Sequence, residues 1–170
     1  GYDFRPSYLA IAEIRKLKPE AAILALTATA TPKVIEDIQE RLDFKEKNVF
    51  RMSFERENLA YIVRETMDKH TELIHILNAV QGSAIVYVRS RKHASDVAAF
   101  ISSQNISATF YHAGLEPAVK NQRQNSWQQN EVRVMVATNA FGMGIDKPDV
   151  RVVVHIDCPD SIEAYFQEAG

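Results

Sequence analysis

The sequence has 170 residues, 46% of them hydrophobic and 25% charged, which is the composition of a globular protein with a sizeable core. Its apolar runs all fall short of the roughly 20 residues that a membrane-spanning helix needs, and a net charge of −2 argues against a uniformly basic nucleic-acid binder, so that any such site must be local. Cys158 is the only cysteine, which excludes an internal disulfide and predicts a reducing, intracellular location.

The first part of the chain predicts two helices on either side of a buried strand. Apolar residues recur at helical spacing over residues 7–18. The continuous apolar run 21–28 is long enough for a strand that is buried on both faces. Thr31 and Pro32 then predict the N-cap and the first position of the second helix.

A polar and charged stretch in the middle of the chain predicts a domain boundary. Residues 54–58 separate two short apolar segments, 48–53 and 59–64, that each predict a strand. We therefore expect one domain to end at about residue 58 and the next to span residues 59–170.

The remainder of the chain alternates strands with helices of about ten residues, which predicts a parallel sheet covered by helices on both faces, the doubly wound α/β class. The predicted strands are 84–88, 108–111, 132–137 and 150–155, and the predicted helices are 70–80, 91–103, 116–127 and a last one that begins with a capping box of Asp160 and Glu163.

Ligands of open α/β sheets bind at the carboxyl ends of the strands, and several predicted strand ends are rich in polar side chains. Residues 26–31 alternate hydroxyls with methyl groups, which suits hydrogen bonding to an approaching surface and equally suits a helix-capping turn. Arg89, Arg91 and Lys92 place cations at a helix N-terminus, which favours a bound phosphate over a solvated charge cluster. We expect Arg89 and Arg91 to share one polar patch with His112, which follows the next strand.

The longest of these segments, residues 137–149, combines hydroxyl, amide and carboxylate side chains with Gly142 and Gly144. This density favours a ligand-binding loop over a plain turn. Metal-ligand spacing, a nucleophile elbow and the phosphate-binding loop Gly-x-x-x-x-Gly-Lys-Ser/Thr are all absent from the 170 residues.

Taken in order, these segments resemble the RecQ family of superfamily-two DNA helicases over nearly the whole chain. The wording FGMGIDKP distinguishes RecQ-like sequences from DEAD-box proteins. The similar segments are YDFRP (2–6, aromatic-rich loop), ALTATAT (25–31, motif III), 54–59 (link between lobes), IVYVRSRK (85–92, motif IV), YHAGL (111–115), 136–155 (motif V and the next strand) and 161–170 (start of motif VI).

The resemblance implies two RecA-like lobes with ATP between them and DNA across them. Residues 1–58 would be the C-terminal tail of the first lobe, and residues 59–170 the second lobe, truncated within motif VI. The phosphate-binding loop and the acidic Mg²⁺ motif would precede this piece. The arginine finger and a zinc-binding region would follow it. We therefore expect no catalytic residue, no bound cofactor and no ATPase activity in the piece by itself.

The resemblance also implies DNA-binding roles for residues at matching positions. These are Phe4 and Arg5 in the loop that senses single-stranded DNA, Arg89, Ser90, Arg91 and His112 near DNA phosphates, and Thr138 and Asn139 at the loop edge that faces the DNA backbone.

Nucleotide-linked roles fall to a second set of positions. Thr27 and Thr29 match residues that link the ATP state to lobe movement. Gly144 and Asp146 match the nucleotide-facing part of motif V, with Asp146 a candidate ribose ligand or, alternatively, the cap of the following turn. Gln167 matches the start of motif VI at the lobe interface.

The function expected from the resemblance is ATP-dependent, 3′-to-5′ separation of DNA strands in repair and recombination. It would use ATP and Mg²⁺, act on single-stranded DNA and duplex junctions, and be intracellular, near the nucleoid in a bacterium. The alternatives are an RNA helicase of the same superfamily, a non-catalytic nucleic-acid-binding lobe and a metabolic nucleotide-binding domain.

Overall fold

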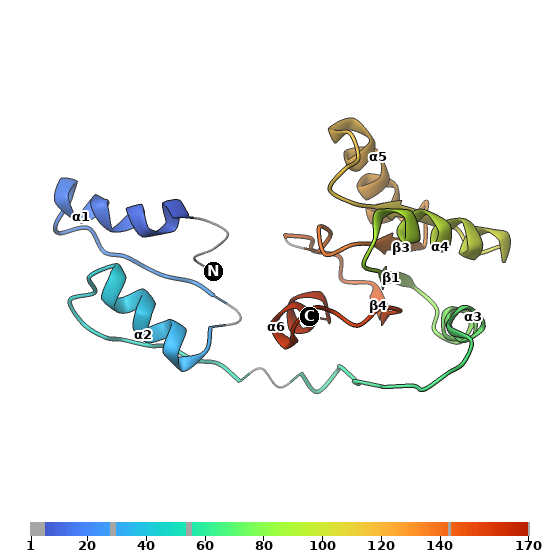
Figure 1. Ribbon diagram of the computed structural model, residues 1–170, viewed down its shortest axis with the longest axis horizontal. Coiled ribbons are helices and arrows are strands. Elements are labelled where there is room, and N and C mark those ends of the chain that lie inside the picture. Colours follow the sequence, from blue (N-terminus) through green and yellow to red (C-terminus); the bar gives the residue numbers. More distant parts are fainter. Residues whose placement is uncertain (1–5, 28–29, 54–55, 143, 170) are drawn as a thin grey trace. The chain divides into compact units, whose positions relative to one another are not determined.

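In the computed structural model the chain forms two units, residues 1–62 and 63–170, which are described separately (Figure 1). In the described part of the chain, the helices are all too short or too polar to cross a membrane. The structure describes residues 6–27, 30–53, 56–142 and 144–169.

The first unit is helical where the sequence predicts helices. A 3₁₀ stretch, η1 (Pro6–Glu13), continues as the short helix α1 (Ile14–Leu17), and α2 (Pro32–Arg41) follows. The Thr31 hydroxyl caps α2 by accepting a hydrogen bond from the backbone N–H of Val34 at 3.4 Å. Pro32 occupies the first helical position, where its missing N–H costs nothing.

The predicted strand over residues 21–28 is wrong for the part that is described. Leu24 and Leu26 are 78% and 84% exposed. A buried strand needs neighbouring strands to pair its backbone groups, and the described residues of this unit form none. The segment is held instead by Arg15, whose guanidinium donates to the Ala21 carbonyl at 2.6 Å.

The predicted strands 48–53 and 59–64 are likewise absent from the described residues, for the same reason. Apolar side chains in both segments lie in solvent, among them Phe50, which is 94% exposed, and Val63, which is 99% exposed.

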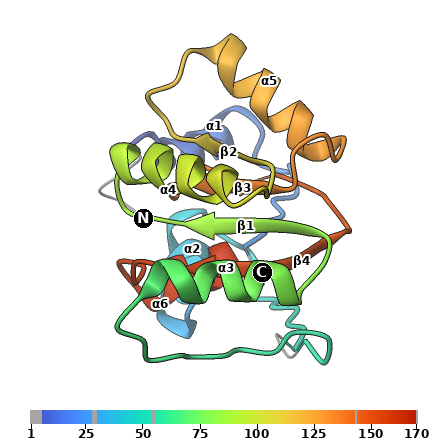
Figure 2. The ribbon, with the colours of Figure 1, turned by 90° about the vertical axis from the view of Figure 1, so that its right-hand side faces the viewer.

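The second unit contains the predicted parallel sheet. Its strand order is β2-β3-β1-β4, and β1 lies between β3 and β4 (Figure 2). The α/β prediction is thus confirmed, with element ends within two residues of those expected. The strands are β1 (Ser83–Tyr87), β2 (Ala108–Tyr111), β3 (Val134–Ala137) and β4 (Val150–His155), and the helices are α3 (Lys69–Ala79), α4 (Arg91–Ser103), α5 (Pro117–Gln128) and α6 (Ile162–Ala169).

One detail of the last helix differs from the prediction. Ser161, and not Asp160, caps α6, because its hydroxyl accepts the backbone N–H of Ala164 at 3.1 Å. The Asp160 carboxylate pairs with Arg89 instead.

Alternate residues of the sheet face two separate apolar clusters, as the period of two in a strand requires. Val86 and Val136 pack with Leu77 of α3 and Val97 of α4. On the other face, Tyr87 and Met135 pack with Trp127 of α5 and with Phe141, which lies in the loop after β3.

That loop, residues 138–149, has an unusual path. It joins β3 to β4, and because both strands are parallel it must return from the carboxyl edge of the sheet to the amino edge. No helix occurs in its described residues. Phe141 fastens it to the sheet, with ring centroids 5.4 Å from Trp127 and 4.9 Å from Tyr111.

We predict that Val97→Ala lowers the free energy of unfolding of residues 63–170 by about 2 kcal/mol, because it removes two buried methyl groups and leaves a cavity. Val63→Ala is the matched control at a side chain that is 99% exposed, and it should change stability by less than about 0.5 kcal/mol. Urea unfolding followed by the fluorescence of Trp127, the sole tryptophan, measures both. An equal loss of unfolding free energy in the two variants would contradict the placement of Val97 in the core.

Candidate functional site

A cavity of about 180 Å³ opens at the carboxyl ends of β1, β3 and β4. Residues at the strand ends and on α6 line it, and one cationic side chain faces three carboxylates there. The lining residues are Tyr87, Val88, Arg89, Thr138, Asn139, Asp157, Pro159, Asp160, Ala164 and Glu168.

Asp157 organises this cavity by joining two segments that are distant in sequence. Its Oδ2 accepts the backbone N–H of Arg89 at 3.0 Å and lies 3.0 Å from Nδ1 of His93. Burial alone would raise the pKa of Asp157, but the hydrogen bonds from Arg89 and His93 outweigh it and hold that pKa below its usual value. The Arg89 guanidinium reaches the same side and pairs with Asp160.

Arg91 turns the other way, toward the loop after β2. A Cβ added at Gly114 would lie 2.6 Å from the Arg91 guanidinium, so the two groups are in close contact. Burial, and then the charge of Arg91, lower the pKa of His112 in the same loop. The structure therefore brings Arg91 and His112 together. The expectation that Arg89 shares their patch is wrong, because its guanidinium pairs instead with Asp160, which follows β4.

Two further cations support this patch, and both bond to backbone. Lys120 donates to the Ala113 carbonyl at 2.6 Å. Arg123 donates to the Phe110 carbonyl at 2.9 Å and lies 3.7 Å above the Phe110 ring. Nδ1 of His112 is buried and has no hydrogen-bond partner among the described residues. The result is a cationic surface with one unsatisfied ring nitrogen.

Ser90, Thr138 and Asn139 lie between these two regions. Ser90 caps α4, and its hydroxyl oxygen accepts the backbone N–H of His93 at 3.1 Å. Thr138 donates its backbone N–H to the Tyr111 carbonyl at 3.2 Å. Asn139 is exposed at the cavity rim.

Gly144 and Asp146, for which the resemblance implies a nucleotide-facing role, lie farther along the loop that begins at Thr138. Gly144 has a φ of +73° and open space where a side chain would be, so the chain turns there in a conformation that favours glycine. Asp146 is exposed, and its carboxylate makes no hydrogen bond to another described residue. The turn-cap alternative is therefore not realised within the described residues.

The remaining predicted positions are described each within its own unit. Gln167 is exposed on α6, and Thr27 is exposed in the first unit. Phe4, Arg5 and Thr29 lie outside the described residues. Within the described ranges, no group of three or more potential ligands is arranged for a metal ion.

Sequence reasoning missed the polar pair that holds α6. His155 Nε2 lies 2.9 Å from Glu168 Oε2, and these side chains are only 12% and 11% exposed. The His155 ring stacks on Tyr87 with centroids 5.2 Å apart. Burial, and then the charge of Glu168, raise the pKa of the Tyr87 hydroxyl. A signal for this pair was available in the sequence. His155 is the last residue of β4, and ligands of open α/β sheets bind at the carboxyl ends of the strands.

Comparison with known proteins gives one family match and several close relatives. Residues 66–170 match the family described as helicase conserved C-terminal domain. Over its whole length the chain is 40% identical to ATP-dependent DNA helicase RecQ of Haemophilus influenzae, of which it covers 28%. It is also 42% identical to ATP-dependent DNA helicase Q1 of Pongo abelii, of which it covers 27%. The chain thus spans less than a third of these relatives.

A solved structure shares the fold. A DEAD box protein from Methanococcus jannaschii superimposes with a TM-score of 0.54 at 19% identity, over 59% of this chain and 28% of that chain. At this identity the likeness is one of architecture alone.

We predict that Arg91→Met raises the pKa of His112, because it removes a nearby positive charge that disfavours the protonated imidazole. NMR titration of the histidine ring resonances measures the pKa in both proteins. Lys92→Met is the control, since Lys92 pairs with Asp96 and is 86% exposed. An unchanged His112 pKa in the Arg91 variant would show that the two side chains are not neighbours.

Proposed function

The chain belongs to the helicase conserved C-terminal domain family and is similar to RecQ helicases along its entire length. We therefore propose that it is part of an ATP-dependent DNA helicase. The observation that carries the proposal is the 40% identity to named DNA helicases over the whole chain. We assign residues 1–58 to the tail of the first lobe and residues 59–170 to the second lobe.

The patch of Arg91 and His112 is proposed to hold DNA phosphates. Arg91 keeps its charge at all physiological pH values. Because its pKa is lowered, His112 is mainly neutral near pH 7 and acts as a hydrogen-bond donor or acceptor instead of a second charge. Ser90 uses its oxygen as an acceptor in the helix cap, which leaves its O–H free to donate to a phosphate. Few fixed charges suit a protein that must release DNA in each cycle.

The loop 138–149 is proposed to join the DNA side to the nucleotide side. Thr138 and Asn139 stand at its start, beside the cavity. Gly144 and Asp146 stand later in the loop, where a free carboxylate suits hydrogen bonds from ribose hydroxyls. ATP with Mg²⁺ supplies the driving reaction when bound, and its phosphates would be held by residues outside this sequence, which has no phosphate-binding loop.

The remaining roles are proposed on the resemblance alone. Phe4 and Arg5 would sense single-stranded DNA, Thr27 and Thr29 would transmit the ATP state, and Gln167 would face the other lobe. Movement in the 3′-to-5′ sense, a role in repair and recombination, an intracellular site of action and a separate zinc site belong to the same set of proposals.

Strand displacement by the full-length protein tests the function directly. DNA duplexes with a 3′ tail, DNA duplexes with a 5′ tail and the matching RNA duplexes separate the outcomes. ATP-dependent opening of 3′-tailed DNA alone is expected. Opening of RNA only, or binding without opening, would favour the RNA-helicase or the non-catalytic alternative.

In the full-length protein, Arg91→Met should weaken single-stranded DNA binding to a similar degree for all sequences and reduce the slope of log affinity against log salt by about 1, because one phosphate contact is lost. Fluorescence anisotropy titrations at several salt concentrations measure both quantities. Lys92→Met serves as the control of equal charge change. An unaltered salt slope for Arg91→Met would remove this residue from the DNA site.

In the same protein, Asp146→Ala should raise the apparent KM for ATP and leave the DNA affinity and the melting temperature nearly unchanged, since a ribose contact is lost while no internal bond is broken. Asp146→Asn, which keeps an oxygen acceptor, should have the smaller effect. Steady-state ATP hydrolysis measures the apparent KM of each variant, and thermal denaturation measures its melting temperature. A lower melting temperature with unaltered ATP kinetics would assign Asp146 a purely structural role.

A further inference from the structure

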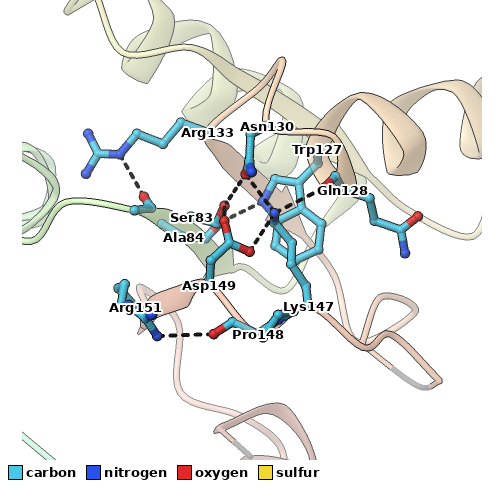
Figure 3. Close-up of polar contacts among 11 residues, drawn as sticks. Ser83, Ala84, Trp127, Gln128, Asn130, Arg133, Lys147, Pro148, Asp149 and Arg151 are labelled. Atoms are coloured by element: carbon cyan, nitrogen blue, oxygen red, sulfur yellow. Dashed lines mark hydrogen bonds and ion pairs between the residues drawn. The ribbon is translucent and has the colours of Figure 1, made fainter.

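The far end of the loop 138–149 is fixed by a buried lysine at the amino edge of the sheet. The Lys147 side chain is only 4% exposed, and its ammonium pairs with Asp149 Oδ1 at 2.7 Å. It also donates to Asn130 Oδ1 at 2.7 Å and to the Gln128 carbonyl at 3.3 Å (Figure 3). These contacts match the three N–H donors of an ammonium group.

The acceptors around Lys147 belong to separate elements of the fold. Gln128 ends α5, and Asp149 precedes β4. Oδ2 of Asp149 in turn accepts the Ser83 hydroxyl at 3.1 Å, at the start of β1. The Lys147 ammonium lies 5.3 Å from the centre of the Trp127 ring, and it is the main cause of the lowered pKa of Asp149. Lys147 thus ties the loop directly to the end of α5, and through Asp149 to the start of β1.

This arrangement constrains the loop more tightly than a surface ion pair would. A buried cation is strongly disfavoured unless its donors are all paired, so the ammonium has few acceptable positions. Asp146 directly precedes Lys147 in the chain. Fixing Lys147 therefore limits where the exposed Asp146 carboxylate can lie.

We propose that Lys147 is a positioning residue for nucleotide use: its ammonium, held by Asn130, Asp149 and the Gln128 carbonyl, sets the place of Asp146 in the loop. The inference rests on the proposed function, in which Asp146 faces the nucleotide. Lys147 itself touches neither nucleotide nor DNA in this account, and it acts only through the backbone that it secures.

The test uses the full-length helicase with Lys147→Met, which retains much of the side-chain length and removes the charge. A displacement of about 1 Å in a positioned group can cost on the order of 100-fold in rate. For Lys147→Met, which would displace Asp146 through the backbone, we expect the apparent KM for ATP to rise about tenfold. Single-stranded DNA affinity at fixed salt should stay within about twofold of the unmodified protein. The KM change separates positioning from simple support of the fold, which would lower only the melting temperature.

Two further variants keep the test decisive. Asn130→Gly removes one acceptor at a residue whose φ is +62°, a conformation that glycine tolerates, and it should raise the KM for ATP by a smaller factor. Arg151→Met is the matched control: Arg151 is exposed and reaches the Pro148 carbonyl at 3.2 Å, so it touches the same end of the loop from outside. Its KM should be unaltered.

The outcomes are distinct. A raised KM in Lys147→Met and Asn130→Gly, with Arg151→Met unaffected, supports the inference. An unaltered KM in both of the first two variants, or an equal rise in the control, overturns it. Failure of the unmodified full-length protein to hydrolyse ATP in response to DNA would instead defeat the proposed function, and the inference would fall with it.

Discussion

The structure of residues 63–170 depends on one topological constraint: β3 and β4 are parallel but not adjacent, so the chain between them must return along the sheet across β1. Parallel strands are usually joined through a helix, whose backbone groups satisfy one another. The loop 138–149 makes this return without a helix in its described residues. Its course is therefore secured from outside. The Tyr87 hydroxyl donates to the Phe141 carbonyl at 3.0 Å near the start, and Lys147 is held near the end.

The distribution of charge at the carboxyl edge explains how a chain of net charge −2 can still offer a cationic surface. The Arg89 guanidinium pairs with Asp160, which follows β4. Arg91, two residues later, faces no carboxylate among the described residues and lies beside His112. Neighbouring cations at one strand end thus have different surroundings, and the proposed phosphate contact of Arg91 rests on this difference.

The sequence predicted the elements of the second unit well, because the continuous apolar run of the fully buried β1 and the amphipathic face of α4 both leave a local signal. It failed for residues 21–28, where an apolar run says nothing about whether partner strands are present. Strand-end reasoning identified Arg91 and His112 but not the direction of Arg89, which is set by Asp160 at a separation of 71 residues. Such distant pairings have no local pattern, and the same applies to the acceptors of Lys147.

In the proposed function, one loop carries the DNA contact and the nucleotide contact on a shared, anchored backbone. A double-mutant cycle in the full-length protein tests it most directly, with Asn139→Ala at one end of the loop and Asp146→Ala at the other, and with kcat/KM of DNA-stimulated ATP hydrolysis as the readout. If the loop couples the two sites, the combined effect should depart from the sum of the single effects by more than about 0.5 kcal/mol. Additive effects within that margin would show two independent sites and contradict coupling through the loop.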